Sequence, residues 1–325
     1  MRTKKARIIS FFVAITLLLP WSVTYANDAG DGVVGYVADA STIVSNDTYF
    51  DKQWALTKIQ APDAWQITAG SQDILIAVLD TGIDPQHEDL ADKVVGSMNF
   101  TDSPTTADLC GHGTHIAGTI AANANNSLGI AGVVPDCRLV NVKVVNDDGI
   151  CDSPAVAKGI VWATNNGAKV INLSLTFTEP DKALEDAVDY AWSKGAIIVA
   201  AAGNDGGSLP TYPACYANCL AVTATNSDDL LVQLAKYGDW VDIATPGANI
   251  YSTLPGNGYG YKSGTSMATA FAAGVAGMLF TVVSDANGNG RLNDEVRNTI
   301  ENSCDEIGTL GVARGRVNAL KAISG

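Results

Sequence analysis

Short apolar runs alternate with amphipathic stretches along most of this chain. Four of the runs are rich in Val, Ile and Leu and have the length of a strand: ILIAVLD (74–80), LVNVKVV (139–145), KVINLSL (169–175) and AIIVAAAGN (196–204). Because both faces of each run are apolar, they predict buried strands of a parallel sheet. The stretches between them, such as HIAGTIAANA and SPAVAKGIVWATNNGA, have helical patterns. This alternation predicts an α/β fold whose mostly parallel sheet is covered by helices on both faces.

The helix predicted after residue 180 has the clearest boundaries. Asp181 is of the type that caps a helix N-terminus, and Gly195 is of the type that ends one. Between them, apolar residues recur at helical spacing: Ala183, Leu184, Ala187, Val188 and Ala191. In sheets of this kind, ligands bind outside the carboxyl ends of the strands. The polar residues that follow the strands are therefore the candidates for chemistry.

The first 26 residues differ from the rest of the chain. Four basic residues precede an apolar run over 8–19, and small residues end at Ala26. This layout predicts a secretory signal peptide over 1–26, and hence export to the extracellular space or the periplasm. The alternative is an uncleaved anchor, although the run is shorter than the roughly 20 residues of a spanning helix. No later run is long enough to span a membrane, and residues 27–45 lack periodicity and predict a flexible lead-in.

Charge and cysteine content narrow the class of protein further. The chain has 20 Lys and Arg against 34 Asp and Glu, a net charge of −14. Such an acidic chain is a poor candidate for nucleic-acid binding, which needs a basic surface. In an exported protein the six cysteines can form disulfides, and an even count permits 15 complete pairings. The sequence does not choose among them.

Four polar residues stand where the predicted strands end or helices begin. Asp80 in DTGID and Asn204 in AAGN end two strands, His112 in GHGTHIAG opens a helix, and Ser266 in GTSMA opens the last apolar helix. We expect all four segments to meet at one edge of the sheet. There, Ser266 is a candidate nucleophile, His112 its base, and Asp80 the group that orients the imidazole. The Asn204 amide and the Ser266 N–H are candidate donors to an oxyanion.

Each of these residues also has a structural interpretation. Ser266 can be a helix N-cap, Asp80 a turn residue after a strand, and His112 a histidine whose hydrogen bonds are satisfied in the core. A zinc site is a further alternative, because Cys110, His112 and His115 form a C-x-H-x-x-H cluster. Only the distant Cys151 would then supply a fourth ligand, and export to an oxidising compartment argues against that site.

The four motifs VLDTGID, GHGTHIAG, VAAAGN and GTSMA, in this order, resemble the subtilase family of serine endopeptidases. The resemblance covers residues 46–325, and the stretches NNSLGIAG and GRVNALKAI are most similar to the thermitase-like branch. It implies one three-layer domain, the catalytic roles given above, and protein or peptide substrates bound as an extended strand. We therefore expect a monomeric serine endopeptidase that works through an Asp-His-Ser triad and an acyl-enzyme.

The resemblance also implies which segments hold the substrate. They are 147–151 on one side, with Gly149, Ile150 and Cys151, and 173–177 on the other, with Ser174, Leu175, Thr176 and Phe177. The family usually has Gly-Gly where this chain has Thr176 and Phe177. These positions border the pocket for the residue before the cleaved bond, so the departure predicts a narrower preference. The family also has Pro, His and Val where residues 270–272 are Ala, Phe and Ala.

Calcium is the cofactor that the resemblance implies. Its oxygen ligands are three side chains and three backbone carbonyls: Asp47, Asp89 and Asn126, and the carbonyls of Ala124, Leu128 and Ile130. The alternative is an ordinary Asx-rich surface turn. A second candidate, DANGNGRLNDEV (285–296), opens like an EF-hand loop, but Glu295 comes one position early and Val296 stands in twelfth place. A helix connector explains this second stretch equally well.

Together these features predict a secreted, calcium-stabilised serine endopeptidase. Two alternatives remain open at this point: a proteolytically silent subtilase-like protein that binds peptides, and a processing protease of narrow specificity. Residues 27–45 are too few for the long inhibitory pro-domain that many relatives carry. Cys110 and Cys151 lie in segments that flank the site, and they are our candidate pair for a disulfide.

Overall fold

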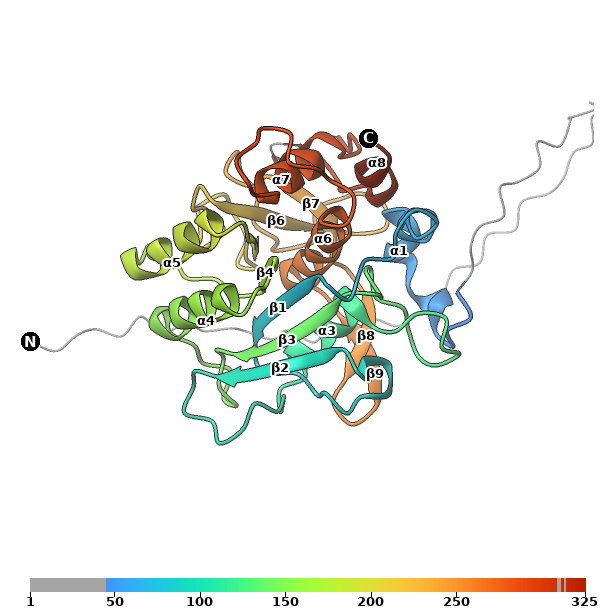
Figure 1. Cartoon of the computed structure of the whole chain (residues 1–325), viewed down its shortest axis with the longest axis horizontal. Helices are drawn as coiled ribbons and strands as arrows, with labels where there is room; N and C mark the ends of the chain where they lie inside the picture. Colours follow the sequence, from blue (N-terminus) through green and yellow to red (C-terminus); the bar gives the residue numbers. More distant parts are fainter. Residues whose placement is uncertain (1–44, 309–310, 313) are drawn as a thin grey trace, which may run out of the picture.

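The computed structural model describes residues 45–308, 311–312 and 314–325 (Figure 1). The predicted signal peptide (1–26) and all but the last residue of the predicted lead-in (27–45) lie outside these residues. Within the part of the chain that the structure describes, no helix is both long and apolar enough to cross a membrane.

A sheet of seven parallel strands forms the centre of the molecule, in the order β2-β3-β1-β4-β5-β6-β7. The strands are β1 (Leu75–Asp80), β2 (Val94–Asn99), β3 (Arg138–Lys143), β4 (Val170–Leu173), β5 (Ile197–Ala201), β6 (Cys219–Thr225) and β7 (Ile243–Pro246). The four runs predicted as buried strands are β1, β3, β4 and β5. The sequence did not single out β6, β7 or β2, and the residues of β2 are half-buried or exposed at the edge of the sheet.

Helices cover both faces of the sheet, which confirms the predicted three-layer α/β fold. On β1, Ile76 and Val78 face one apolar cluster, and Ala77 and Leu79 face the other. The first cluster contains α3 (His112–Ala121), α6 (Thr265–Leu279) and α7 (Asn293–Asn302), and the second contains α4 (Ser153–Asn165) and α5 (Lys182–Ser193). Figure 1 shows α4 and α5 lying together beside the sheet. Shorter helices complete the described chain: η1 (Phe50–Lys52), α1 (Trp54–Lys58), α2 (Ala61–Ala64), η2 (Glu88–Leu90) and α8 (Ala319–Ser324).

The helix signals read from the sequence are confirmed in α5. The Asp181 side chain accepts hydrogen bonds from the amides of Ala183 (2.8 Å) and Leu184 (3.1 Å). After the helix, Gly195 has a φ of +83°, a left-handed conformation that glycine adopts without strain.

The last apolar helix, α6, lies in the core of the domain. All of its residues except Ser266 are buried. A Cβ atom on Gly274 would lie 2.5 Å from the Cβ of Val133, so small residues let the helix pack closely against its neighbours. A helix that is apolar on every side is expected to be buried in this way.

The antiparallel hairpin β8 (Ile250–Leu254) and β9 (Gly258–Lys262) packs on α3 and leads directly into α6. His115 of α3 holds the hairpin, because its Nε2 lies 3.0 Å from the carbonyl oxygen of Ile250 and 3.2 Å from that of Gly260. Burial, together with the nearby His112, lowers the pKa of His115 to about 3. His115 is therefore a neutral core residue that fixes the hairpin against the helix.

Candidate active site

Asp80 and His112 are hydrogen-bonded at the edge of the sheet. Asp80 is the last residue of β1, and His112 is the first residue of α3. The His112 Nδ1 lies 2.7 Å from Asp80 Oδ1, and the Asp80 side chain is only 3% exposed. The same carboxylate oxygen accepts the amide of Thr81 at 2.7 Å. The Thr81 amide fixes the Asp80 carboxylate, and the carboxylate in turn holds the His112 imidazole in one orientation.

Glycines make this meeting of strand and helix possible. A Cβ atom on Gly113 would lie 2.1 Å from the carbonyl oxygen of Gly82 and 3.1 Å from the Cβ of Asp80. No side chain fits at that distance, so the turn after β1 touches the backbone of α3. Gly111, which precedes His112, has a φ of +73°, in the left-handed region that favours glycine. The GHG motif is therefore required by backbone geometry.

The Asp80 carboxylate determines the proton affinity of His112. Burial disfavours the charged ring, but the charge of Asp80 and its hydrogen bond together outweigh burial and raise the pKa of His112 above its ordinary value. The ring therefore accepts a proton more readily than an isolated histidine does. That property suits a general base whose partner is a weakly acidic hydroxyl.

Ser266 lies in the first turn of α6, which begins after Gly264. Its Oγ donates to the carbonyl oxygen of Ser174 at 3.2 Å, and the Ser174 hydroxyl donates to the carbonyl oxygen of Ser266 at 3.0 Å. This pair of hydrogen bonds fastens the segment after β4 to the start of α6. It places the predicted substrate-binding segment 174–177 directly beside the predicted nucleophile.

Asn204 follows β5, and its side chain is oriented by Thr265. The carboxamide oxygen accepts the Thr265 amide at 2.8 Å and the Thr265 hydroxyl at 3.2 Å. That hydroxyl in turn accepts the amide of Gly203 at 3.1 Å. With its oxygen engaged, the Asn204 side chain presents its NH₂ as a donor. Sequence reasoning missed this role of Thr265, for which its position next to Ser266 is the one signal in the sequence.

The two predicted substrate-binding segments are each held by a backbone bridge to a different part of the chain. Residues 149–151 belong to a loop closed by a bridge between Val145 and Cys151, and Ile150 in this loop is exposed. Phe177 ends the other segment and pairs with Tyr212 through two backbone hydrogen bonds of 2.7 and 2.9 Å. The Phe177 side chain is 4% exposed and belongs to the same apolar cluster as Ala214 and Tyr216. Thr176 is half-buried next to it.

Hydrogen bonds link three of the predicted calcium ligands, Asp47, Asp89 and Asn126. The two carboxylate oxygens of Asp47 accept the amides of Asn125 and Asn126, both at 3.0 Å. Asp89 accepts the Asn126 side-chain amide at 2.9 Å and the Ile130 amide at 2.7 Å. Near them, the carbonyl oxygen of Leu128 accepts the amide of Thr48 at 3.1 Å, which joins the loops.

The two carboxylates among these residues are buried, and burial bears on whether they can bind a cation. Asp47 and Asp89 are 5% and 0% exposed, and among the described residues neither forms an ion pair with Lys, Arg or His. Burial raises the pKa of Asp89, although hydrogen bonds from Asn126 and Ile130 oppose that shift. Buried carboxylates without a cationic partner are costly, and hard oxygen donors are the set that Ca²⁺ prefers. The residues therefore fit a bound calcium ion.

The zinc and disulfide hypotheses find no support in the structure. Cys110 Sγ lies 3.4 Å from the carbonyl oxygen of Asp147, while His115 turns its Nε2 to the β8–β9 hairpin. Across the described ranges, no group of three or more His, Cys, Asp or Glu is arranged to hold a metal. All six cysteines are free thiols, so the predicted Cys110–Cys151 bridge is not formed. Burial raises the pKa of the Cys151 thiol to about 12, which keeps it protonated and unreactive.

The EF-hand-like stretch forms a compact turn before α7. Asp285 accepts the amides of Gly288 (2.7 Å), Asn289 (3.1 Å) and Gly290 (2.8 Å). Asn287 and Asn289 donate their side-chain amides to Asp294 at 2.6 and 2.8 Å. The polar side chains thus bind one another and the start of α7, in agreement with the connector interpretation.

Comparisons with known proteins agree with this geometry. The family model of the subtilase family matches residues 71–318. Thermitase of Thermoactinomyces vulgaris is 48% identical over 282 residues, which are 86% of this chain and 98% of thermitase. Subtilisin BL of Lederbergia lenta is 42% identical over 82% of this chain and 96% of its own length. A solved protease structure from Pseudoalteromonas arctica PAMC 21717 superposes with a TM-score of 0.77 at 28% identity, covering 87% of this chain and 99% of the other.

The α/β sheet, the Asp80–His112 pair and the family match define a serine protease fold, and the chain belongs to the subtilase family. By this membership it is an enzyme of the subtilisin type, a class of serine protease. The identity to thermitase also confirms the branch to which the sequence was assigned.

The direction of the His112 pKa shift gives a testable pH dependence. A protonated His112 cannot act as a base, so kcat/KM should rise with pH as the ring loses its proton. Because Asp80 raises the pKa of His112, the midpoint of this rise should lie above the ordinary histidine value of about 6.5. The check is a pH–rate profile on a peptide substrate. A midpoint at or below the ordinary value would contradict the assignment.

Proposed function

We propose that this protein is a secreted, calcium-stabilised serine endopeptidase with Asp80, His112 and Ser266 as its catalytic triad. The observation that carries the proposal is the 2.7 Å hydrogen bond between His112 and Asp80, at the sheet edge where Ser266 and Asn204 also lie. Family membership supports peptide bonds as the substrate class. The signal-like sequence of the first 26 residues supports secretion.

In this mechanism, the Nδ1–H of His112 donates a hydrogen bond to Asp80, and Nε2 of the same ring acts as the base. Ser266 Oγ attacks the scissile carbonyl carbon while its proton passes to His112. The carbonyl oxygen becomes an oxyanion, and the Asn204 NH₂ and the Ser266 N–H donate hydrogen bonds to it. The protonated His112 then gives its proton to the leaving amine. Water, activated by the same imidazole, releases the acid product and restores Ser266.

The preformed donor geometry favours turnover over silent binding. Thr265 holds the oxygen of Asn204, so the amide donor is in place before substrate arrives. The charge of Asp80 is already directed at His112. A protein that only bound peptides would have no use for either arrangement. The substrate would lie between 149–151 and 174–177 as an added strand.

Removing the nucleophile tests the proposal most directly. Ser266→Ala should lower kcat on a peptide substrate by about 10⁶-fold, the loss known for the serine of subtilisin. A fluorophosphonate should label the wild-type protein but not this variant. Ser263→Ala is the matched control, because it removes a nearby hydroxyl that accepts only the Asn249 amide. Equal labelling or equal turnover of the wild type and Ser266→Ala would refute the role of Ser266.

We further propose that calcium binds at Asp47, Asp89 and Asn126, with the carbonyl groups of Ala124, Leu128 and Ile130. A bound ion would neutralise the two buried carboxylates. It would also tie the segment around Asp47 to the loop at 124–130. A ligand that binds only the folded state stabilises it by about 2.7 kcal/mol at 100 times its Kd.

Chelation tests the calcium site through stability. EDTA should lower the Tm of the wild-type protein, and Asp47→Asn should reduce this effect because one ligand carboxylate is lost. Asp51→Asn, an exposed change in the same segment, should keep the full response to EDTA. Differential scanning calorimetry with and without calcium measures these shifts. A wild-type Tm that EDTA leaves unchanged would count against the site.

A narrow substrate preference is the second candidate function, and the 174–177 segment favours it. Phe177 is buried and locked to Tyr212, and Thr176 carries a side chain between that bridge and the contact of Ser174 with Ser266. We infer that the Thr176 side chain, which a glycine would lack, reduces the space for the substrate residue before the cleaved bond, while Phe177 fixes the backbone of the segment through its pairing with Tyr212. We therefore propose a preference for small residues at that position.

Peptide-library profiling tests this preference. Thr176→Gly should raise kcat/KM for substrates with a large residue before the cleaved bond by at least about 10-fold, the effect of one or more methyl-sized groups in a pocket. Thr178→Gly, an exposed change two residues later, should leave the profile unaltered. Identical profiles for the wild type and Thr176→Gly would show that Thr176 does not restrict the pocket.

A further inference from the structure

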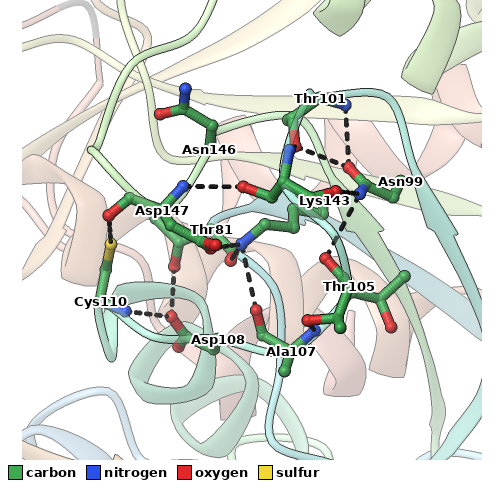
Figure 2. A network of polar contacts seen from close by, with 12 residues as sticks. Thr81, Asn99, Thr101, Thr105, Ala107, Asp108, Cys110, Lys143, Asn146 and Asp147 are labelled. Carbon is green, nitrogen blue, oxygen red and sulfur yellow. Dashed lines mark hydrogen bonds and ion pairs between the residues drawn. The ribbon is translucent and has the colours of Figure 1, made fainter.

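Asp108 is a buried carboxylate that lies between Thr81, the residue after Asp80, and the residues that flank His112. It is 3% exposed and accepts five hydrogen bonds. One oxygen accepts the hydroxyl of Thr81 (2.8 Å) and the amides of Cys110 (3.0 Å) and Gly111 (2.8 Å). The other accepts the amide (2.8 Å) and the hydroxyl (2.7 Å) of Thr114. Figure 2 shows Asp108 beside Thr81 and Cys110.

These contacts join the two elements that carry Asp80 and His112. Thr81 directly follows Asp80, whereas Gly111 and Thr114 flank His112 in the first turn of α3. The Thr81 hydroxyl extends the link, because it also accepts the amide of Gly113 at 3.0 Å. The carboxylate of Asp108 therefore ties the end of β1 to the start of α3 through side-chain bonds on both sides.

Lys143 fixes the same turn from the other side. It is fully buried on β3, pairs in register with Asp80, and donates its ammonium group to the carbonyl oxygens of Thr81 and Ala107 (Figure 2). Ala107 is the residue before Asp108. The Lys143 ammonium group also forms an ion pair with Asp147, at 2.9 Å. Lys143 thus holds the main chain of both segments that Asp108 connects.

The chemistry of the site requires an anion at position 108. Among the described residues Asp108 forms no ion pair with Lys, Arg or His, so hydrogen-bond donors and the N-terminal end of α3 compensate its charge. All five partners are donors to a carboxylate, which is an acceptor only. An asparagine would turn an NH₂ group toward donors at one of the two oxygen positions and would lose every backbone-amide bond made there.

We propose that Asp108 is a positioning residue that sets the Asp80–His112 geometry for catalysis. This inference rests on the proposed triad. Asp108 touches neither substrate nor the reacting atoms, and it acts by fixing the relative position of β1 and α3. A displacement of a catalytic pair by about 1 Å can cost about 10²-fold in rate, so the loss should fall on the chemical step.

The first test compares Asp108→Asn with the wild type by steady-state kinetics. The variant should lose about 10²-fold in kcat with little change in KM, because Asp108 itself hydrogen-bonds to neither substrate-binding segment. Asp181→Asn is the matched control. It alters a carboxylate that also accepts amides at a helix start, but on α5, away from the site. It should lose stability without a comparable loss in kcat.

The second test removes the link without changing charge. Thr81→Val deletes the hydroxyl that joins Asp108 to Gly113 and should also lower kcat at unchanged KM. The proton NMR signal of His112 Nδ1–H reports the hydrogen bond to Asp80, and it should shift or broaden in both variants. If Asp108→Asn folds poorly, the kinetics and the Nδ1–H signal of Thr81→Val still test the proposal.

Outcomes separate this inference from the proposed function. Wild-type kcat and an unchanged Nδ1–H signal in folded Asp108→Asn and Thr81→Val, with only a lowered Tm, would reduce Asp108 to a structural role. The triad would be unaffected by that result. Full activity of Ser266→Ala would instead refute the proposed function itself.

Discussion

The contact between the turn after β1 and the first turn of α3 is the constraint on which the site depends. Gly113 approaches the Gly82 carbonyl so closely that no Cβ atom can be placed there. Only this approach brings a residue at a strand end, Asp80, within 2.7 Å of a residue at a helix start, His112. The backbone therefore determines the pair, and the side chains act within that geometry.

Buried charge is the second organising feature of this acidic protein. Asp80, Asp89 and Asp108 are each at most 3% exposed, and each accepts at least one backbone amide. Charged groups at such sites are costly unless they are compensated. At Asp80 the partner is an imidazole, at Asp108 it is a helix N-terminus with Lys143 nearby, and at Asp89 the donor set fits a cation. Each carboxylate thus has a different set of partners that compensates its charge.

Much of the fold was predictable because buried parallel strands have apolar residues on both faces. The four strands read from the sequence lie next to one another in the sheet, whereas β2, with half-exposed residues, lacked that signal. The buried strands β6 and β7 were also not predicted from the sequence. Asp80, His112, Asn204 and Ser266 could be grouped because the carboxyl ends of parallel strands share one edge. The predicted Cys110–Cys151 bridge is not formed in the structure. Sequence spacing says nothing about the distance between two thiols.

The sequence by itself determined the α/β class, the family and the four candidate catalytic residues, because these depend on local pattern and chain order. Only the tertiary structure decided that Thr265 orients Asn204, that Phe177 pairs with Tyr212, and that Asp108 joins Thr81 to the start of α3. Each of these contacts links segments that are distant along the chain, and a hydrogen bond exists only within about 3.5 Å. That distance is set by how the layers pack, which no single segment of the sequence encodes.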